Sequence, residues 1–171
     1  MGSGKTHWGR RIGAKLNLPF HDLDSIIVEQ EKRSVSEIFA EKGEEYFRYQ
    51  EKETLEKISA EQESFILSCG GGTPCFFNNI EFMKKNGKVI WLNTSVDQLT
   101  QRLKREQASR PLISDVVTDE DLRRYVIRKL SERRMYYQQA DVTVEEETTN
   151  LDELIRILLQ NHESDRLKEE L

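Results

Sequence analysis

Short apolar runs alternate with longer charged stretches along this chain of 171 residues. Each run is three or four residues long and holds β-branched, aromatic or leucine side chains, as buried strands tend to do. The four runs occupy 18–20, 65–68, 89–92 and 142–144. Because strands that alternate with helices usually pair in parallel, the pattern predicts an α/β fold with a central parallel sheet and helices on both faces.

Capping residues mark where the helices of the charged stretches begin. One helix continues from the N-terminal loop over 9–16, and the last is capped by Asn150 and carries an apolar stripe at spacings of three and four residues. Three more starts have capping-box spacing, in which a hydroxyl residue and an acidic residue three positions later satisfy each other's backbone N–H groups. These pairs are Ser34 with Glu37, Thr94 with Asp97, and Thr118 with Asp121.

Composition narrows the classes of protein that fit. The length and a hydrophobic content of 36% suit one domain over 1–171, with the charged end at 164–171 as a tail. A net charge of −5 gives no support to nucleic-acid binding through bulk positive charge. Two cysteines are too few for a disulfide framework, and no apolar run resembles a signal peptide or a membrane span. We expect a cytoplasmic monomer with no zinc, nucleic-acid partner or membrane partner.

The first six residues, MGSGKT, contain the second half of a phosphate-binding loop. Such a loop needs glycines, so that backbone N–H groups can converge on phosphates, a lysine for the β and γ oxygens, and a hydroxyl that ligates Mg²⁺. The residues that supply these parts are Gly2, Ser3, Gly4, Lys5 and Thr6. The helix that follows adds its positive N-terminal end, which also favours an anion.

The full phosphate-loop pattern would place its first glycine one position before Met1, after a buried strand. In doubly wound folds that strand lies in the middle of the sheet, so its loss would separate the neighbouring strands by roughly 9–10 Å. Such a gap would expose unpaired backbone groups. We therefore expect that the natural polypeptide carries about ten more residues ahead of Met1.

Two further motifs follow predicted strands. In HDLD, Asp22 and Asp24 lie at the carboxyl end of the first run, where α/β folds bind ligands, and they face the same way if the strand continues through them. Asp22 could act through a magnesium-bound water, and Asp24 could accept the proton of a substrate hydroxyl. The alternative is that these carboxylates simply cap a helix. The glycines at 70–72 follow the second run and would let backbone N–H groups approach a ligand.

The order of the motifs resembles the shikimate kinase family. MGSGKT, FHDLD, SVSEIFAEKGEEYFR, ILSCGGGTP, SRPLI and ERRMYYQQAD occur in that order, and the resemblance runs from Met1 to about Val144. It implies a three-layer P-loop kinase fold with sheet order 2-3-1-4-5, of which the first strand is absent from this sequence. It also implies transfer of the γ-phosphate of ATP to the 3-hydroxyl of shikimate, in the biosynthesis of aromatic amino acids.

The resemblance implies individual roles on the nucleotide side of the site. Lys5 matches the phosphate-loop lysine, Thr6 the magnesium hydroxyl and Asp22 the carboxylate near magnesium. Arg102 matches an arginine near the adenine. Arg110 matches an arginine of a lid, at about 107–121, that closes over ATP and stabilises the charge of the phosphoryl group.

Other residues match the shikimate side, within a subregion at about 25–60 and beyond it. Asp24 matches the aspartate that holds shikimate hydroxyls and serves as the base. Arg48 and Arg133 match the two arginines that grip the shikimate carboxylate, a task suited to a planar guanidinium. The glycines Gly70, Gly71 and Gly72 match the substrate-binding glycines. The neighbouring Arg134 leaves the register of Arg133 open by one position.

Each arginine also has a structural alternative. Arg48 could pair with Glu44 or Glu45 on its own helix, while Arg102 and Arg133 could be solvated surface charges. For the whole protein, one alternative is another small-molecule P-loop kinase that acts on gluconate or a nucleotide, and another is an inactive nucleotide-binding remnant. The acceptor-side residues favour a small hydroxylated carboxylate over a nucleotide.

Overall fold

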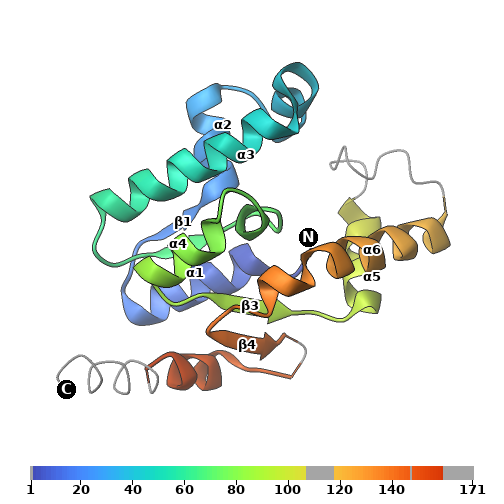
Figure 1. Ribbon diagram of the computed structural model, residues 1–171. Coiled ribbons are helices and arrows are strands. Elements are labelled where there is room, and N and C mark those ends of the chain that lie inside the picture. The colour runs from blue at the N-terminus through green and yellow to red at the C-terminus, as the bar shows by residue number, and fades with distance from the viewer. Residues whose placement is uncertain (1, 107–117, 147, 160–171) are drawn as a thin grey trace.

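The computed structural model describes residues 2–106, 118–146 and 148–159 (Figure 1). Helices and strands alternate along most of this range, as the apolar pattern predicts. In chain order they are α1 (Lys5–Leu16), β1 (Phe20–Asp22), α2 (Leu23–Glu31), α3 (Val35–Glu61), β2 (Ile66–Ser68), the 3₁₀ turn η1 (Thr73–Cys75), α4 (Asn79–Asn86), β3 (Ile90–Asn93), α5 (Val96–Glu106), α6 (Asp119–Tyr137), β4 (Val142–Glu145) and a helix at 151–159.

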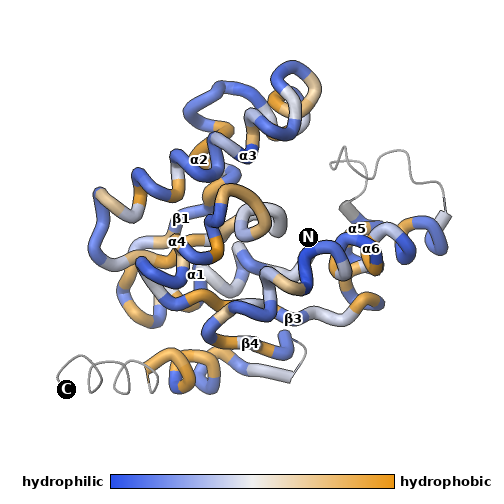
Figure 2. The backbone as a smooth tube through the Cα atoms, viewed as in Figure 1, coloured by the Kyte–Doolittle hydropathy of each residue, from blue (hydrophilic) through white to orange (hydrophobic). Residues whose placement is uncertain are grey.

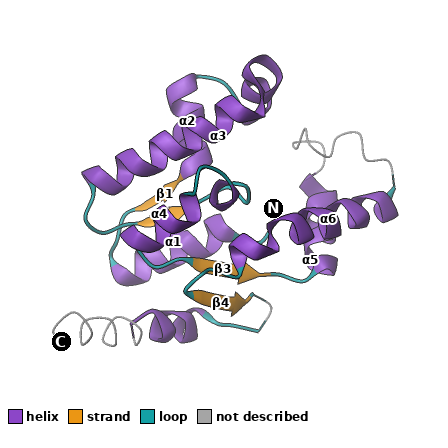
Figure 3. Ribbon diagram, in the orientation of Figure 1, coloured by secondary structure: helices purple, strands orange, loops and turns teal. Residues whose placement is uncertain are grey.

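The four strands form two parallel pairs, and β2 and β3 do not pair within the described residues. In one sheet β1 pairs with β2, and in the other β3 pairs with β4 (Figure 3). These pairs correspond to places 2-3 and 4-5 of the predicted order, on either side of the place assigned to the first strand. The alternation therefore confirms the α/β fold, and the central sheet is present as two halves.

Helix α1 packs against both halves of the sheet. Trp8 and Ile12 belong to a buried cluster with Val142 and Val144 of β4, and Ile66 of β2 packs against the same cluster. The contact with β1 requires the helix to have no side chain on its facing side. A Cβ atom added at Gly9 would lie 2.4 Å from the Phe20 ring, far inside van der Waals contact. Glycine thus lets the helix that carries the phosphate loop lie directly on the strand that carries Asp22.

The pair α2 and α3 forms a second core beside β1 and β2. Leu23, Ile27, Ile38, Phe47 and Leu55 are its largest fully or nearly fully buried apolar residues. Elsewhere α3 is strongly hydrophilic, with apolar residues only at intervals (Figure 2). The helix bends at Gly43, whose φ of 84° lies in the left-handed region that favours glycine.

Most of the predicted helix starts are confirmed. Ser34 and Glu37 form the predicted capping box, and the Thr118 hydroxyl accepts from the backbone N–H of Asp121. Asn150 accepts from the N–H three residues later. The Thr94 cap is wrong, because the neighbouring Ser95 hydroxyl accepts from the backbone N–H of Gln98 at 3.3 Å.

The first predicted strand is displaced by two residues. The prediction covered 18–20, whereas β1 spans Phe20–Asp22. The reason is local: the N–H of Leu18 donates to the carbonyl of Gly13 at 2.9 Å, so Leu18 still belongs to the C-terminal turn of α1. None of the helices in the described parts of the chain is long and apolar enough to cross a membrane.

Candidate active site

The phosphate loop is a left-handed turn that leads into α1. Gly4 caps the helix with a φ of 76°, and Gly2 has a φ of 61°, both in the region that favours glycine. The carbonyl of Gly4 accepts the first helical bond, from the N–H of Trp8 at 3.0 Å. Lys5 and Thr6 therefore occupy the first turn, where N–H groups have no acceptor within the helix and, with the helix dipole, favour an anion.

Thr6 and Asp22 are in direct contact. The Thr6 Oγ1 donates to Asp22 Oδ2 at 2.9 Å, although 16 positions separate the two residues. Asp22 also caps α2, because its Oδ1 accepts from the Ser25 N–H at 3.3 Å. The helix-cap interpretation of Asp22 is therefore confirmed, and the other oxygen of the same carboxylate lies against Thr6.

Asp24 lies in a different place from the one its spacing suggests. The condition under which Asp22 and Asp24 would face the same way is not met, because β1 ends at Asp22 and Asp24 lies in the first turn of α2. The Asp24 Oδ1 is buried and has no hydrogen-bond partner among the described residues. Burial raises the pKa of the Asp24 carboxyl, and the neighbouring Asp22 raises it further, while Lys5 and Arg48 lower it. One residue from the predicted nucleotide side, Lys5, and one from the predicted shikimate side, Arg48, thus lower the pKa of the same carboxyl group.

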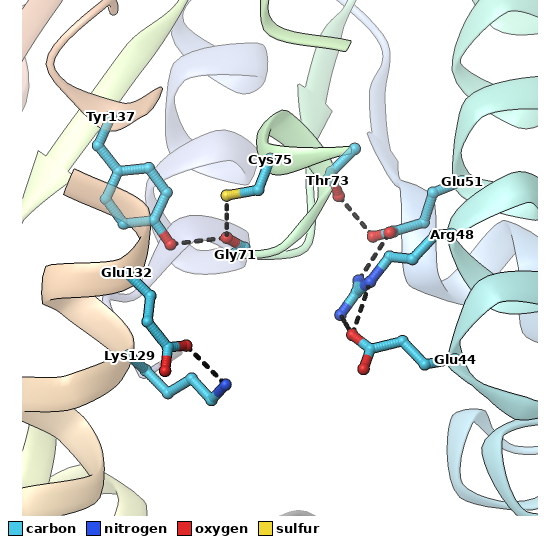
Figure 4. A network of polar contacts seen from close by, with 9 residues as sticks. All are labelled: Glu44, Arg48, Glu51, Gly71, Thr73, Cys75, Lys129, Glu132 and Tyr137. Atoms are coloured by element: carbon cyan, nitrogen blue, oxygen red, sulfur yellow. Dashed lines mark hydrogen bonds and ion pairs between the residues drawn. The ribbon is translucent and has the colours of Figure 1, made fainter. Parts of the chain in front are cut away.

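A buried ion pair holds Arg48 (Figure 4). Its Nη1 donates to Glu51 Oε2 at 2.7 Å, and its Nη2 donates to Glu44 Oε1 at 2.8 Å. The other oxygen of Glu51 accepts from the Thr73 hydroxyl at 2.5 Å. The ring of Phe76 lies against the guanidinium, with its centroid 4.9 Å from Cζ. Pairing of Arg48 with Glu44 was predicted as the structural alternative, and it is present. The structure shows Glu51 as a second partner of the same guanidinium.

Burial and the neighbouring opposite charges together determine the pKa of Arg48 and of Glu51. Burial lowers the pKa of Arg48, but Glu51 and Glu44 outweigh it, so the pKa is raised overall. Burial raises the pKa of the Glu51 carboxyl, and Arg48 and Thr73 lower it only in part. Arg48 therefore remains a cation within a largely buried site.

The three glycines leave space for these side chains. A Cβ atom added at Gly70 would lie 2.7 Å from Glu51 Oε1, and one at Gly72 would lie 2.6 Å from Arg48 Cζ. The loop carbonyls are bound within the protein: that of Gly70 accepts from Thr73, that of Gly71 from Tyr137, and that of Gly72 from Cys75. The close approach expected at these glycines is thus made, at least in part, by the protein's own Glu51 and Arg48.

The end of α6 lies beside the same loop. The Tyr137 hydroxyl donates to the Gly71 carbonyl at 2.7 Å (Figure 4). Arg133, one turn earlier, lowers the pKa of both Tyr137 and Cys75, which burial raises. Its charge therefore acts next to the loop. The choice of Arg133 over Arg134 for the substrate remains a prediction.

Arg102 contacts the phosphate loop itself. Its Nη1 donates to the Gly2 carbonyl at 3.1 Å, and its Nη2 forms an ion pair with Glu146 at 3.0 Å. It is therefore not simply a solvated charge. Arg110 and the predicted lid, apart from its last residues at 118–121, lie outside the described residues.

Sequence reasoning missed several residues that complete the site. The buried acceptor of Arg48 lies three positions after it, a helical spacing that could have suggested the pair. The other partners are far apart in sequence and gave no such signal. The missed residues are Glu51, Thr73, Tyr137 and Glu146.

The two-halved parallel sheet, the glycine loop at the N-terminus of α1 and the adjoining carboxylates define a P-loop kinase. The sequence matches the family profile of shikimate kinase over residues 1–163. Two similar proteins are the shikimate kinase of Azobacteroides pseudotrichonymphae, 38% identical over 93% of each chain, and that of Flavobacterium psychrophilum, 42% identical over 84% of each chain.

Solved structures agree with the sequence matches. The crystal structure of shikimate kinase from Bacteroides thetaiotaomicron has a TM-score of 0.82 and 35% identity, covering 97% of this chain and 94% of that one. Shikimate kinase from Acinetobacter baumannii in complex with shikimate has a TM-score of 0.81 and 32% identity, covering 98% and 90%. The chain belongs to the shikimate kinase family and is an ATP-dependent phosphotransferase.

Proposed function

We propose that this chain transfers the γ-phosphate of ATP to the 3-hydroxyl of shikimate, with Asp24 at the point of transfer. The observation that carries the assignment is the buried Asp24 Oδ1, which lies beside Gly70 and has no hydrogen-bond partner among the described residues. Among the charges that lower the pKa of this carboxyl are those of Lys5 and Arg48. The first belongs to the phosphate loop and the second to the buried acceptor site. A carboxylate between them can orient a substrate hydroxyl towards the phosphate and accept its proton.

On the nucleotide side, Lys5 and the backbone of Gly2, Ser3 and Gly4 bind the phosphates of ATP. Arg102 holds the loop through the Gly2 carbonyl and extends the site towards the adenine. Arg110 stabilises the charge on the transferred phosphoryl group. In phosphoryl transfer the protein mainly positions the reactants and neutralises charge, so these groups need no covalent intermediate.

Thr6 and Asp22 fit a site for Mg²⁺. The hydroxyl and the carboxylate already lie 2.9 Å apart, and both are oxygen ligands of the kind that this ion takes. Because Mg²⁺ usually keeps several waters and binds substrate phosphates, two protein groups are sufficient to hold it. When bound, it would neutralise phosphate charge during transfer.

On the acceptor side, Arg48 and Arg133 grip the shikimate carboxylate beside the glycines Gly70, Gly71 and Gly72. The two partners of Arg48 differ in a way that suits this task. The Glu51 side chain is buried, whereas that of Glu44 is 56% exposed. We expect the substrate carboxylate to replace Glu44 on the guanidinium while Glu51 stays in place.

The protein is proposed to act as a cytoplasmic monomer. The basis for the compartment is that Cys69 and Cys75 are both free thiols. Equilibrium sedimentation of the purified protein would test the oligomeric state, and a mass equal to that of a dimer would contradict it.

The function can be tested by a coupled assay of ADP release with shikimate, gluconate and nucleoside monophosphates offered separately. Of the three acceptors, we expect turnover with shikimate and not with the others. Turnover should stop when Mg²⁺ is chelated and return when Mg²⁺ is restored. Thr6→Val should raise the Mg²⁺ concentration needed for half-maximal activity by a larger factor than it raises the KM for shikimate. Turnover with gluconate or a nucleoside monophosphate in place of shikimate would contradict the proposal.

A further inference from the structure

We propose that Tyr137 is a positioning residue for the acceptor, because its hydroxyl fixes the peptide between Gly71 and Gly72 in one orientation. The inference rests on the proposed function of the glycine loop and assigns a role to a side chain that does not itself need to touch the substrate. Tyr137 is the last residue of α6, and the loop follows β2, so the contact joins segments 66 positions apart.

The Tyr137 side chain is itself held firmly. Its hydroxyl donates to the Gly71 carbonyl at 2.7 Å, the usual length of a well-formed O–H···O hydrogen bond. Its ring packs against the indole of Trp91 in β3, with the ring centroids 5.7 Å apart. A tyrosine with its ring packed on a strand has little freedom to move its hydroxyl away. The position of the Gly71 carbonyl is therefore set by β3 and α6 together.

Fixing that carbonyl also fixes the N–H of Gly72. The chain has no cis peptide bond in its described residues, and across a trans peptide the C=O and N–H groups point in opposite directions. In Figure 4, Tyr137 lies on one side of the loop, and Arg48 and Glu51 lie on the other. With the carbonyl bound to Tyr137, the Gly72 N–H is directed away from Tyr137, towards the Arg48 side where the carboxylate of the substrate would bind.

A peptide between two glycines needs such an anchor. Glycine adopts positive and negative φ about equally well, so a Gly–Gly peptide can rotate without a steric penalty. A residue with a side chain does not fit at Gly72, since Arg48 fills the space there. The glycines therefore leave room for Arg48 but make the loop more flexible. The hydrogen bond from Tyr137 limits that flexibility.

The same contact places Arg133. It lies four positions before Tyr137, on the same side of α6 and one turn away. The charges of Arg133 and Arg48 both lower the pKa of Cys75, so this thiol lies within reach of the two guanidinium groups. Docking the end of α6 on Gly71 thus keeps the second arginine beside the first.

The test is the steady-state kinetics of Tyr137→Phe in the full chain. This change removes the hydroxyl and keeps the ring that packs on Trp91. We expect the KM for shikimate to rise about 3- to 10-fold, as for the loss of one hydrogen bond, with the KM for ATP and kcat changed less than two-fold. Tyr136→Phe is the matched control, because it removes the same group from the adjacent residue of α6, and it should leave all three constants unchanged.

Hydrogen exchange supplies a readout that does not depend on activity. The N–H groups of Thr73 and Cys75 donate to the carbonyls of Gly70 and Gly72, so they report on the order of the loop. We expect faster exchange at these two amides in Tyr137→Phe and unchanged exchange in Tyr136→Phe.

The outcomes separate this inference from the proposed function. A wild-type chain that fails to phosphorylate shikimate contradicts the proposed function, while the exchange of the loop amides still decides whether Tyr137 orders the loop. An active wild type whose Tyr137→Phe variant keeps both its KM for shikimate and its slow amide exchange overturns the inference. A loss of thermal stability with no change in that KM also overturns it, since it would leave Tyr137 a purely structural role.

Discussion

Two arginine–glutamate pairs, one on each side of the site, are built in different ways. On the acceptor side, the side chains of Arg48 and Glu51 are only 6% and 1% exposed. On the nucleotide side, those of Arg102 and Glu146 are 32% and 13% exposed. The first pair lies within one helix, and the second joins α5 to the end of β4.

The difference shows how each half of the site is prepared for its ligand. A buried pair has a large desolvation cost, which contact between the charges and further hydrogen bonds must offset. Such a pair is a weak source of stability, but it keeps a guanidinium fixed and charged. The more exposed pair loses less hydration and is screened by solvent, so both its desolvation cost and its favourable contribution to stability are smaller. The acceptor side is therefore the more rigidly preorganised half.

The largest effect should come from the carboxylate between the two halves. Asp24→Asn removes the group that accepts the hydroxyl proton and should lower kcat about 100- to 10,000-fold, measured as ADP release at saturating shikimate. The exposed Glu29→Gln on the same helix is the control and should keep its activity. In the wild type, kcat should fall with decreasing pH as Asp24 protonates, at a higher pH than an ordinary aspartate would require, because its pKa is raised by burial. Retention of most of the turnover in Asp24→Asn would rule out its role as base.

The next effect concerns the buried pair and separates stability from binding. Glu51→Leu or Arg48→Met alone leaves one charge without its buried partner and should lower the free energy of unfolding by about 3–5 kcal/mol. The double variant should recover much of that loss, yet bind shikimate no better than Arg48→Met. Urea unfolding and calorimetric titration with shikimate would measure the two quantities. Additive losses of stability in the double variant would show that the pair is not coupled.

A smaller effect should appear in stability when Asp24 becomes Asn. Because the folded-state pKa of Asp24 is raised, the folded protein binds its proton more tightly than the unfolded chain does, so this group lowers stability as the pH rises through that pKa. Asp24→Asn should therefore have a higher Tm than the wild type at neutral pH. The gain should shrink as the pH falls below the folded-state pKa. Calorimetric scans across pH would measure it, and a lower Tm for the variant at neutral pH would contradict the prediction.

The smallest effect should come from the exposed pair. Arg102→Gln should cost about 0.2–1 kcal/mol of stability, because the pair with Glu146 is partly solvated. Loss of the hydrogen bond to the Gly2 carbonyl should raise the KM for ATP about two- to five-fold and leave the KM for shikimate unchanged. Thermal unfolding and the same coupled assay provide the numbers. A KM for shikimate that rose as much as that for ATP would remove the distinction between the two halves.

The sequence predicted the elements and the main charged residues well, because these leave local signals. Apolar runs marked the four strands, and a capping box marked the start of α3 at Ser34. The order of the motifs from Met1 to about Val144 indicated the shikimate kinase family, and the family profile confirms it. The roles of the individual site residues remain predictions.

The errors and omissions have physical causes. The sequence left open whether the first strand continues through Asp24, because spacing alone does not reveal that Asp22 ends the strand by capping α2. Tyr137 was missed because its partner is a backbone carbonyl, which every residue carries and no motif marks. Thr94 was predicted as a cap because Asp97 follows it at capping-box spacing, and the sequence did not reveal that Thr94 is buried while the Ser95 hydroxyl makes the contact.

The packing of α1 has a consequence for how the protein comes apart. The two halves of the sheet share no backbone hydrogen bonds within the described residues, so they are held together by side-chain contacts, among them those of α1 and the hydrogen bond from Tyr137 to Gly71. Mild denaturation should then release the β3–β4 half and the β1–β2 half as separate cooperative units. Enzymatic activity, which needs both halves held in place by α1 and by the contact of Tyr137 with Gly71, should disappear with whichever unit unfolds first.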